Sequence, residues 1–85
     1  MRKQLSSAFE SKRLVVVNVP GHCMTGVAYD HGSDQLKIWN PQGYTGKYKE
    51  LGVQMEHGFF SVPISEVKEK VSSLTIETSE NSASD

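Results

Sequence analysis

The sequence predicts an α+β domain: a helix at the start of the chain, an antiparallel sheet or half-barrel of about four to six strands, and a short late helix. Three observations lead to this fold class. Residues 14–19 (LVVVNV) are almost all β-branched, which is typical of a strand. Residues 22–30 and 35–40 flank the turn sequence HGSD and predict a hairpin. Residues 2–12 and 64–71 place apolar side chains at helical spacing.

The first half of the chain supplies one helix and two strands. The helix at 2–12 has a packing face made by Leu5, Ala8, Phe9 and Lys12. Residues 14–19 predict a strand buried on both faces, and Pro20-Gly21 turns the chain into the strand at 22–30. Because strand side chains alternate, we expect two sets on opposite faces of that strand: His22, Met24, Gly26 and Ala28, and then Cys23, Thr25, Val27 and Tyr29.

The second half is expected to complete the sheet. The predicted elements are a strand at 35–40, a loop at 42–49, a weak strand at 53–56, a strand at 59–62, a helix at 64–71 and an edge strand at 74–77. Pro41 ends the first of these because it cannot donate a ladder hydrogen bond, and Pro63 suits the start of the helix. Tyr44 and Tyr48 are expected to fold back over the sheet. Residues 1–77 then form one domain, and the polar residues 78–85 a disordered tail.

Composition excludes several classes of function. With 85 residues, 36% of them hydrophobic, the chain is one small domain with a modest core. A net charge of −1 argues against nucleic acid or an anionic membrane as the main partner. No apolar run is long enough to span a bilayer or to form a signal-peptide core. The single cysteine allows no intrachain disulfide and fits a reducing compartment, which favours a cytoplasmic location.

His22 and Asn40, at distant ends of the predicted hairpin, form the most specific pattern in the sequence. They share a face of the sheet only if the numbers of paired residues sum to an even value. A five-residue loop at 29–33 sets them directly opposite each other, and a three-residue loop at 31–33 makes them diagonal neighbours roughly 7–8 Å apart. A four-residue loop at 31–34 brings them together only with a β-bulge.

A histidine beside a carboxamide suits proton transfer near neutral pH. The imidazole works best as a base when an oxygen holds its second nitrogen, and the Asn40 carbonyl oxygen can do this without adding charge. Such a pair is half of a cysteine-nucleophile site. The nucleophile is not evident, because Cys23 directly follows His22 and should point the other way. We interpret Cys23 as a buried small hydrophobe.

Metal and cofactor sites are disfavoured. A metal site would have to combine His22 and Asp30 with His31 and Asp34, yet the last two lie in the turn, far along the strand from His22. Residues 43–46 (GYTG) lack the Gly-Lys-Ser/Thr ending of a phosphate loop. We therefore expect no metal and no cofactor.

These pieces, in this order and spacing, resemble the C-terminal half of papain-like cysteine peptidases, and calpain-type catalytic domains most closely. In that family Gly-His opens a strand, a hairpin follows, and the next strand ends in Asn-Pro-Trp-Gly. The matching pieces cover nearly all of residues 4–77: QLSSAFESKRLVVVNV, GHCMTGVAYD, LKIWNPQG, HGFFSVPISEV and SSLTIE. The resemblance implies a papain-like C-terminal subdomain over residues 1–77. It also implies that His22 is the catalytic general acid/base and that Asn40 orients it.

The sequence departs from the family in two ways. Gln42 replaces the tryptophan that shields the His–Asn hydrogen bond, and the family's N-terminal half, which carries the nucleophilic cysteine, has no counterpart here. Three interpretations remain: the His/Asn half of a cysteine peptidase that is inactive alone, a non-catalytic protein-binding domain, or part of a papain-like deamidase or transglutaminase. The last more often has Asp in place of Asn40. The implied partners are a complementary catalytic half or another protein chain, and a peptide substrate.

Overall fold

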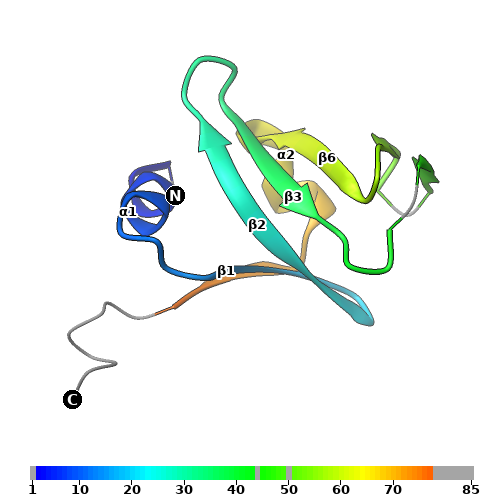
Figure 1. The fold of residues 1–85 in the computed structure, drawn as a ribbon, viewed down its shortest axis with the longest axis horizontal. Coiled ribbons are helices and arrows are strands. Elements are labelled where there is room, and N and C mark those ends of the chain that lie inside the picture. The colour runs from blue at the N-terminus through cyan, green and yellow to red at the C-terminus, as the bar shows by residue number, and fades with distance from the viewer. Residues whose placement is uncertain (1, 44, 50, 78–85) are drawn as a thin grey trace.

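The strands build one antiparallel sheet and a separate hairpin (Figure 1). The computed structural model describes residues 2–43, 45–49 and 51–77. Its elements are α1 (Arg2–Glu10), β1 (Val15–Val19), β2 (His22–Asp30), β3 (Gln35–Trp39), β4 (Gly46–Tyr48), β5 (Val53–Met55), β6 (Phe59–Pro63), α2 (Ile64–Lys70) and β7 (Ser73–Ile76). The five-stranded sheet has the order β6-β3-β2-β1-β7, and β4 pairs with β5. Every ladder is antiparallel, which confirms the α+β prediction.

Strand β2 joins the two parts of the sheet. Its first half, His22–Gly26, pairs with β1, and its second half, Thr25–Asp30, pairs with β3. The two ladders overlap at Thr25 and Gly26, and the register then shifts at Val27, where a β-bulge lies. Because a bulge strengthens the local twist, β3 crosses the direction of β1 and β7 steeply in Figure 1.

One face of the sheet carries the core. Cross-strand pairing puts Val15, Gly26 and Ile38 on this face, and Val15 and Ile38 are fully buried. Both helices pack here: Phe9 of α1 lies 3.5 Å from the position a Cβ atom would take at Gly26, and Val67 of α2 is 1% exposed. Burying these apolar side chains together is the main stabilising contribution to the fold.

The opposite face of the sheet has no covering layer among residues 2–43, 45–49 and 51–77. Trp39 and Phe59 are paired across β3 and β6, each is 38% exposed, and their ring centroids lie 6.3 Å apart. The ammonium group of Lys37 lies 5.0 Å from the centroid of the Phe59 ring, which is within the range of a cation–π interaction. The two aromatic rings therefore form a half-covered apolar strip on the side away from the helices.

The structure corrects two predictions about strand faces. Strand β1 is buried on one face only, because Val16 and Asn18 are half-buried on the open side. Ala28 does not share the face of His22: the bulge at Val27 changes the alternation, so that Ala28 is exposed and Tyr29 is half-buried against the core.

Smaller differences concern element boundaries. Helix α1 ends at Glu10, and Lys12, predicted on its packing face, is exposed with φ +56°. The expected loop at 42–49 contains the short strand β4. Tyr48 does fold back over the sheet and contacts the Phe60 ring edge-to-face, whereas Tyr44 and the tail at 78–85 lie outside the described residues. β7 lies at the edge of the sheet, as predicted.

Candidate functional site

His22 is delivered to the site by the turn between β1 and β2. Gly21 adopts φ +76°, a left-handed conformation that favours glycine, and it connects Pro20 to the first residue of β2. His22 pairs with Val19 across the ladder and is half-buried. The imidazole therefore lies at the end of the core face of the sheet, where solvent can still reach it.

Asn40 is fixed by contacts of its backbone. It directly follows β3, its N–H donates to the Gly58 carbonyl at 2.8 Å, and its own carbonyl accepts from the Gly43 N–H at 2.7 Å. A Cβ atom at Gly58 would lie 2.7 Å from the Asn40 carbonyl oxygen, and one at Gly43 would lie 2.8 Å from it. Only glycine permits this approach at either position. Asn40 is a buried polar residue, 7% exposed.

The bulge at Val27 brings the two side chains to the same face. The turn is the four-residue loop 31–34, and next to it the paired numbers sum to an odd value, as in Asp30 with Gln35. Beyond the bulge the pairing is Gly26 with Ile38, whose sum is even. The structure therefore has the four-residue loop with a β-bulge, which is one of the three loop geometries predicted to place His22 and Asn40 on the same face.

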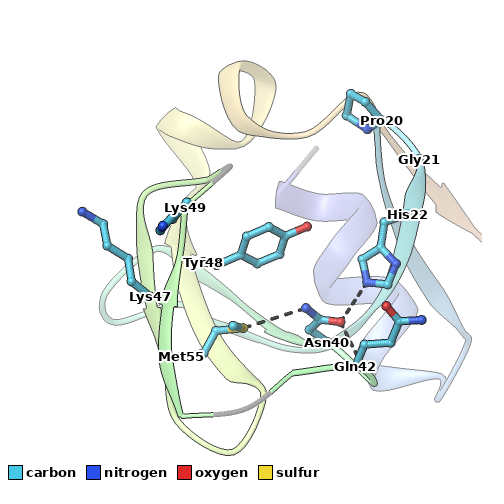
Figure 2. A pocket seen from close by; sticks show the side chains of 9 residues that line it. All are labelled: Pro20, Gly21, His22, Asn40, Gln42, Lys47, Tyr48, Lys49 and Met55. Carbon is cyan, nitrogen blue, oxygen red and sulfur yellow. Dashed lines mark hydrogen bonds between the residues drawn. The ribbon is translucent and has the colours of Figure 1, made fainter.

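The two side chains are directly hydrogen-bonded (Figure 2). His22 Nε2 lies 2.8 Å from Asn40 Oδ1. The same oxygen accepts from the Gln42 backbone N–H at 3.1 Å, and Asn40 Nδ2 points to the Met55 sulfur at 3.9 Å. Because a backbone N–H can only donate, Gln42 fixes which end of the amide is the oxygen. His22 Nε2 must then carry the proton of its hydrogen bond, and in the neutral ring Nδ1 keeps a lone pair. The arrangement is that of a base whose tautomer is already selected.

A cavity of about 530 Å³ opens beside this pair. Its lining comes from the β1–β2 turn, the segment after β3 and the β4–β5 hairpin: Pro20, Gly21, His22, Asn40, Gln42, Lys47, Tyr48, Lys49 and Met55. In Figure 2 the Tyr48 ring extends into the cavity with its hydroxyl directed toward His22, and Lys47 points away. The imidazole therefore faces a space that a second group can enter.

Cys23 cannot serve as the nucleophile for His22. It is the next residue on β2 and faces the open side of the sheet, where its thiol lies 3.4 Å from Asn18 Oδ1 as a donor. Asn18 in turn donates to the hydroxyls of Ser73 and Thr75 on β7. The prediction that Cys23 is buried is wrong: it is exposed, because the sheet face that carries it has no covering layer among the described residues.

The acidic and histidine residues of the turn lock α1 to the hairpin. Asp34 accepts two hydrogen bonds from the Arg2 guanidinium, at 2.9 and 2.8 Å, and a further one from the Tyr29 hydroxyl. These bonds lower the pKa of Asp34 to about 2, with the Arg2 bond as the largest cause, and the bond to Asp34 raises the pKa of Tyr29. His31 Nε2 lies 2.6 Å from the Ser6 hydroxyl.

Asp30 holds the turn itself. It accepts from the Ser33 hydroxyl at 2.8 Å and from the Gly32 N–H at 3.0 Å, and these bonds lower its pKa, the Ser33 bond most. Within residues 2–43, 45–49 and 51–77, no three His, Cys, Asp or Glu side chains gather closely enough to hold a metal ion.

Three features of the site could not be predicted from the sequence. Met55 and Tyr48 look like ordinary core residues in the sequence, and they reach the pair only because the β4–β5 hairpin folds over the end of the sheet. The Gln42 contribution is a backbone N–H, which no residue type encodes. A close backbone approach at Gly43 and Gly58 could have been predicted, since a glycine often marks one. The sequence does not show that both glycines approach the same group, the Asn40 carbonyl oxygen.

No protein-family model matches this sequence, and comparison with curated proteins and with solved structures finds no match. Neither helix in the described part of the chain has the length and apolar character needed to cross a bilayer.

Proposed function

We propose that this chain supplies the His/Asn half of a papain-like cysteine-peptidase site, and that another segment or chain supplies the nucleophilic cysteine. The observation that carries the proposal is the hydrogen bond between His22 Nε2 and Asn40 Oδ1, with the amide fixed by Gln42 and Met55. The hydrogen bond from Nε2 leaves the lone pair of the neutral ring on Nδ1. A general base needs such a nitrogen, because its reactive nitrogen must hold a lone pair.

The chemistry follows from the free nitrogen. A thiol brought within hydrogen-bonding distance of Nδ1 gives its proton to that nitrogen, which leaves a thiolate and an imidazolium. The thiolate attacks the peptide carbonyl, and the C–N bond breaks as the imidazolium returns the proton from Nδ1 to the departing amine, which leaves a thioester. Water, giving its proton to Nδ1, then hydrolyses the thioester, and the acid product and the free thiol are released. Throughout, Nε2–H donates to Asn40 Oδ1, so the ring keeps its orientation while its charge changes.

The isolated chain is expected to have no peptidase activity. Its single cysteine lies on the other face of the sheet from His22, so no thiol of this sequence reaches Nδ1. Turnover of a peptide by the purified chain, abolished by His22→Ala, would contradict this and would require a nucleophile other than the one proposed.

The test is to express the reading frame with its natural flanking sequence, or with the partner chain that co-purifies, and to measure peptide hydrolysis and labelling by a thiol-directed epoxide. We expect His22→Ala to reduce kcat/KM by about 10²–10⁴-fold, the usual contribution of a general acid/base. His57→Asn is the matched control, because His57 lies exposed in the turn before β6 with φ +55°, which asparagine tolerates. Full activity in His22→Ala would refute the proposal.

One observation favours a second candidate, a non-catalytic protein-binding domain derived from the same fold. Gln42, where the resemblance implies a shielding tryptophan, is exposed, and its smaller side chain offers less cover to the part-buried His22–Asn40 hydrogen bond. In a binding domain, His22→Ala and Asn40→Ala leave partner affinity unchanged. In a peptidase half, both reduce turnover of the assembled enzyme.

A further inference from the structure

Asn40 can present either of two faces to His22. A rotation of 180° about the bond to the amide carbon exchanges Oδ1 and Nδ2. In the observed orientation Oδ1 accepts from His22 Nε2, so the lone pair of the ring lies on Nδ1. In the rotated orientation Nδ2–H would point at Nε2, which would have to lose its proton, and the proton would move to Nδ1. Amide orientation therefore decides which ring nitrogen is basic.

Two groups hold the observed orientation, and they come from different parts of the chain. The Gln42 N–H donates to Oδ1 at 3.1 Å, two residues from Asn40. The Met55 sulfur, 3.9 Å from Nδ2, comes from β5 in the hairpin that walls the cavity. A thioether sulfur accepts weakly and cannot donate, so it accommodates the NH₂ end of the amide and not the oxygen end.

The Met55 sulfur is a weak acceptor, but its hydrogen bond becomes important because the Asn40 amide is buried. Asn40 is 7% exposed and Met55 is 2% exposed, so water has little access to Nδ2. Among the side chains that the structure describes, no buried nitrogen or oxygen lacks a hydrogen-bond partner, and for Nδ2 that partner is the Met55 sulfur. A buried donor without a partner would be unfavourable.

We propose that Met55 is a positioning residue, which holds the Asn40 amide so that His22 keeps its proton on Nε2 and its lone pair on Nδ1. The effect on the tautomer stands on the contacts alone, and its consequence for catalysis rests on the proposed function. The β4–β5 hairpin then has a second role besides forming the cavity wall: together with the Gln42 N–H, it selects the basic nitrogen.

The experiment is ¹⁵N NMR of the His22 ring in the purified chain, at a pH at which the ring is neutral. In the unaltered chain we expect the Nε2–H tautomer to predominate. Met55→Leu conserves volume and removes the acceptor, and we expect it to raise the ratio of Nδ1–H to Nε2–H by about twofold to fivefold. Met55→Gln places a carbonyl oxygen near Nδ2 and should restore the original ratio. The matched control is Met24→Leu, which removes an equally buried thioether, 2% exposed, without touching the Met55–Asn40 contact.

Several results would overturn the proposal: a predominant Nδ1–H form in the unaltered chain, an unchanged ratio in a folded Met55→Leu variant, an equal change in Met24→Leu, or no restoration by Met55→Gln. If Met55→Leu does not fold, hydrogen exchange of the Asn40 Nδ2 protons is compared between the unaltered chain and Met55→Gln, which keep the same burial and differ in the acceptor. Slower exchange in Met55→Gln supports the contact, and equal exchange overturns it. None of these readouts needs peptidase activity, so the tautomer result and the activity result can fail separately.

Discussion

Replacing Gly58 by alanine should disturb the site through the backbone of Asn40. Gly58 has φ +87°, and an added Cβ would lie 2.7 Å from the Asn40 carbonyl oxygen. The conformational strain costs about 1–2 kcal/mol, and crowding against backbone adds about 1–3 kcal/mol, less a small gain from a stiffer unfolded chain. We expect Gly58→Ala to lower the free energy of unfolding by about 2–4 kcal/mol, a large part of the stability of a domain this size.

Two other glycines separate strain from crowding. Gly52 has φ +67° and no described heavy atom within 4 Å of its Cβ position, so Gly52→Ala reports strain alone, about 1 kcal/mol. A Cβ at Gly43 would lie 2.8 Å from the Asn40 carbonyl oxygen and 2.5 Å from the Gly58 Cα, so Gly43→Ala reports crowding, about 1–3 kcal/mol. The assay is urea unfolding followed by far-UV circular dichroism, with the His22 ratio of tautomers measured on each folded variant. If Gly58→Ala is no less stable than Gly52→Ala, the close approach to Asn40 has no energetic role and the reasoning fails.

Three further predictions concern Asn40, Asp34 and Val27. Asn40→Ala leaves the Gln42 N–H without its acceptor and should lower the free energy of unfolding by about 1–3 kcal/mol, measured by urea titration. A change below about 0.5 kcal/mol is typical of a surface substitution, and it would contradict a stabilising role for the buried hydrogen bonds of Asn40. The pKa of Asp34 is lowered in the fold to about 2, so its ionised form contributes stability above the ordinary carboxyl pKa, and this contribution is lost as pH falls through about 2. Thermal unfolding between pH 4 and 2 should therefore show a smaller decline in Asp34→Asn, with the remainder due in part to Asp30, whose pKa is also lowered; equal declines would exclude Asp34 as a cause. Deleting Val27 removes the bulged residue and shortens β2 by one, so the pairs Gly26 with Ile38 and Ala28 with Lys37 become consecutive and His22 still shares a face with Asn40. We therefore expect the His22 tautomer to be unchanged; a redistributed tautomer would show that the bulge has a role beyond register.

The long, regular elements were predictable because local pattern and tertiary environment agree in them. The β-branched run became β1, and the turn at 31–34 connects the two strands expected on either side of it. Ile64 and Val67 became the buried face of α2, as their helical spacing suggested. In each case the face that the periodicity marked as apolar is the face that the fold buries.

The site was predictable in part. From the alternation of side chains along a strand, we could predict which loop lengths would place His22 and Asn40 on the same face. The structure places them there through a bulge at Val27. Gly26, an isolated glycine directly before Val27, is compatible with a bulge, but it is equally compatible with a close approach of a neighbouring residue, and a Cβ there would lie 2.9 Å from Val15. The sequence alone does not decide between the two. Cys23 was misjudged because its burial depends on a layer over the second face of the sheet, and a strand pattern does not reveal such a layer.

Met55 shows why the remaining part of the site could not be derived. Its role depends on a contact between segments fifteen residues apart, at a distance set by how the β4–β5 hairpin lies over the end of the sheet. A methionine in a short apolar strand is compatible with simple packing. Only the coordinates of the Asn40 amide show that the sulfur meets its nitrogen end.

The bulge at Val27 also lies between the His22–Asn40 pair and the tip of the β2–β3 hairpin. Residue pairs on the side of the bulge away from the tip, such as Gly26 with Ile38, set the positions of His22 and Asn40. The tip is held by hydrogen bonds to α1, from Arg2 to Asp34 and between Ser6 and His31. A reporter peptide grafted between Gly32 and Ser33 would therefore lengthen the loop while the imidazole and carboxamide stay in place. The hairpin tip is therefore a suitable site for immobilising or labelling the protein in experiments that test whether a cysteine-bearing partner exists.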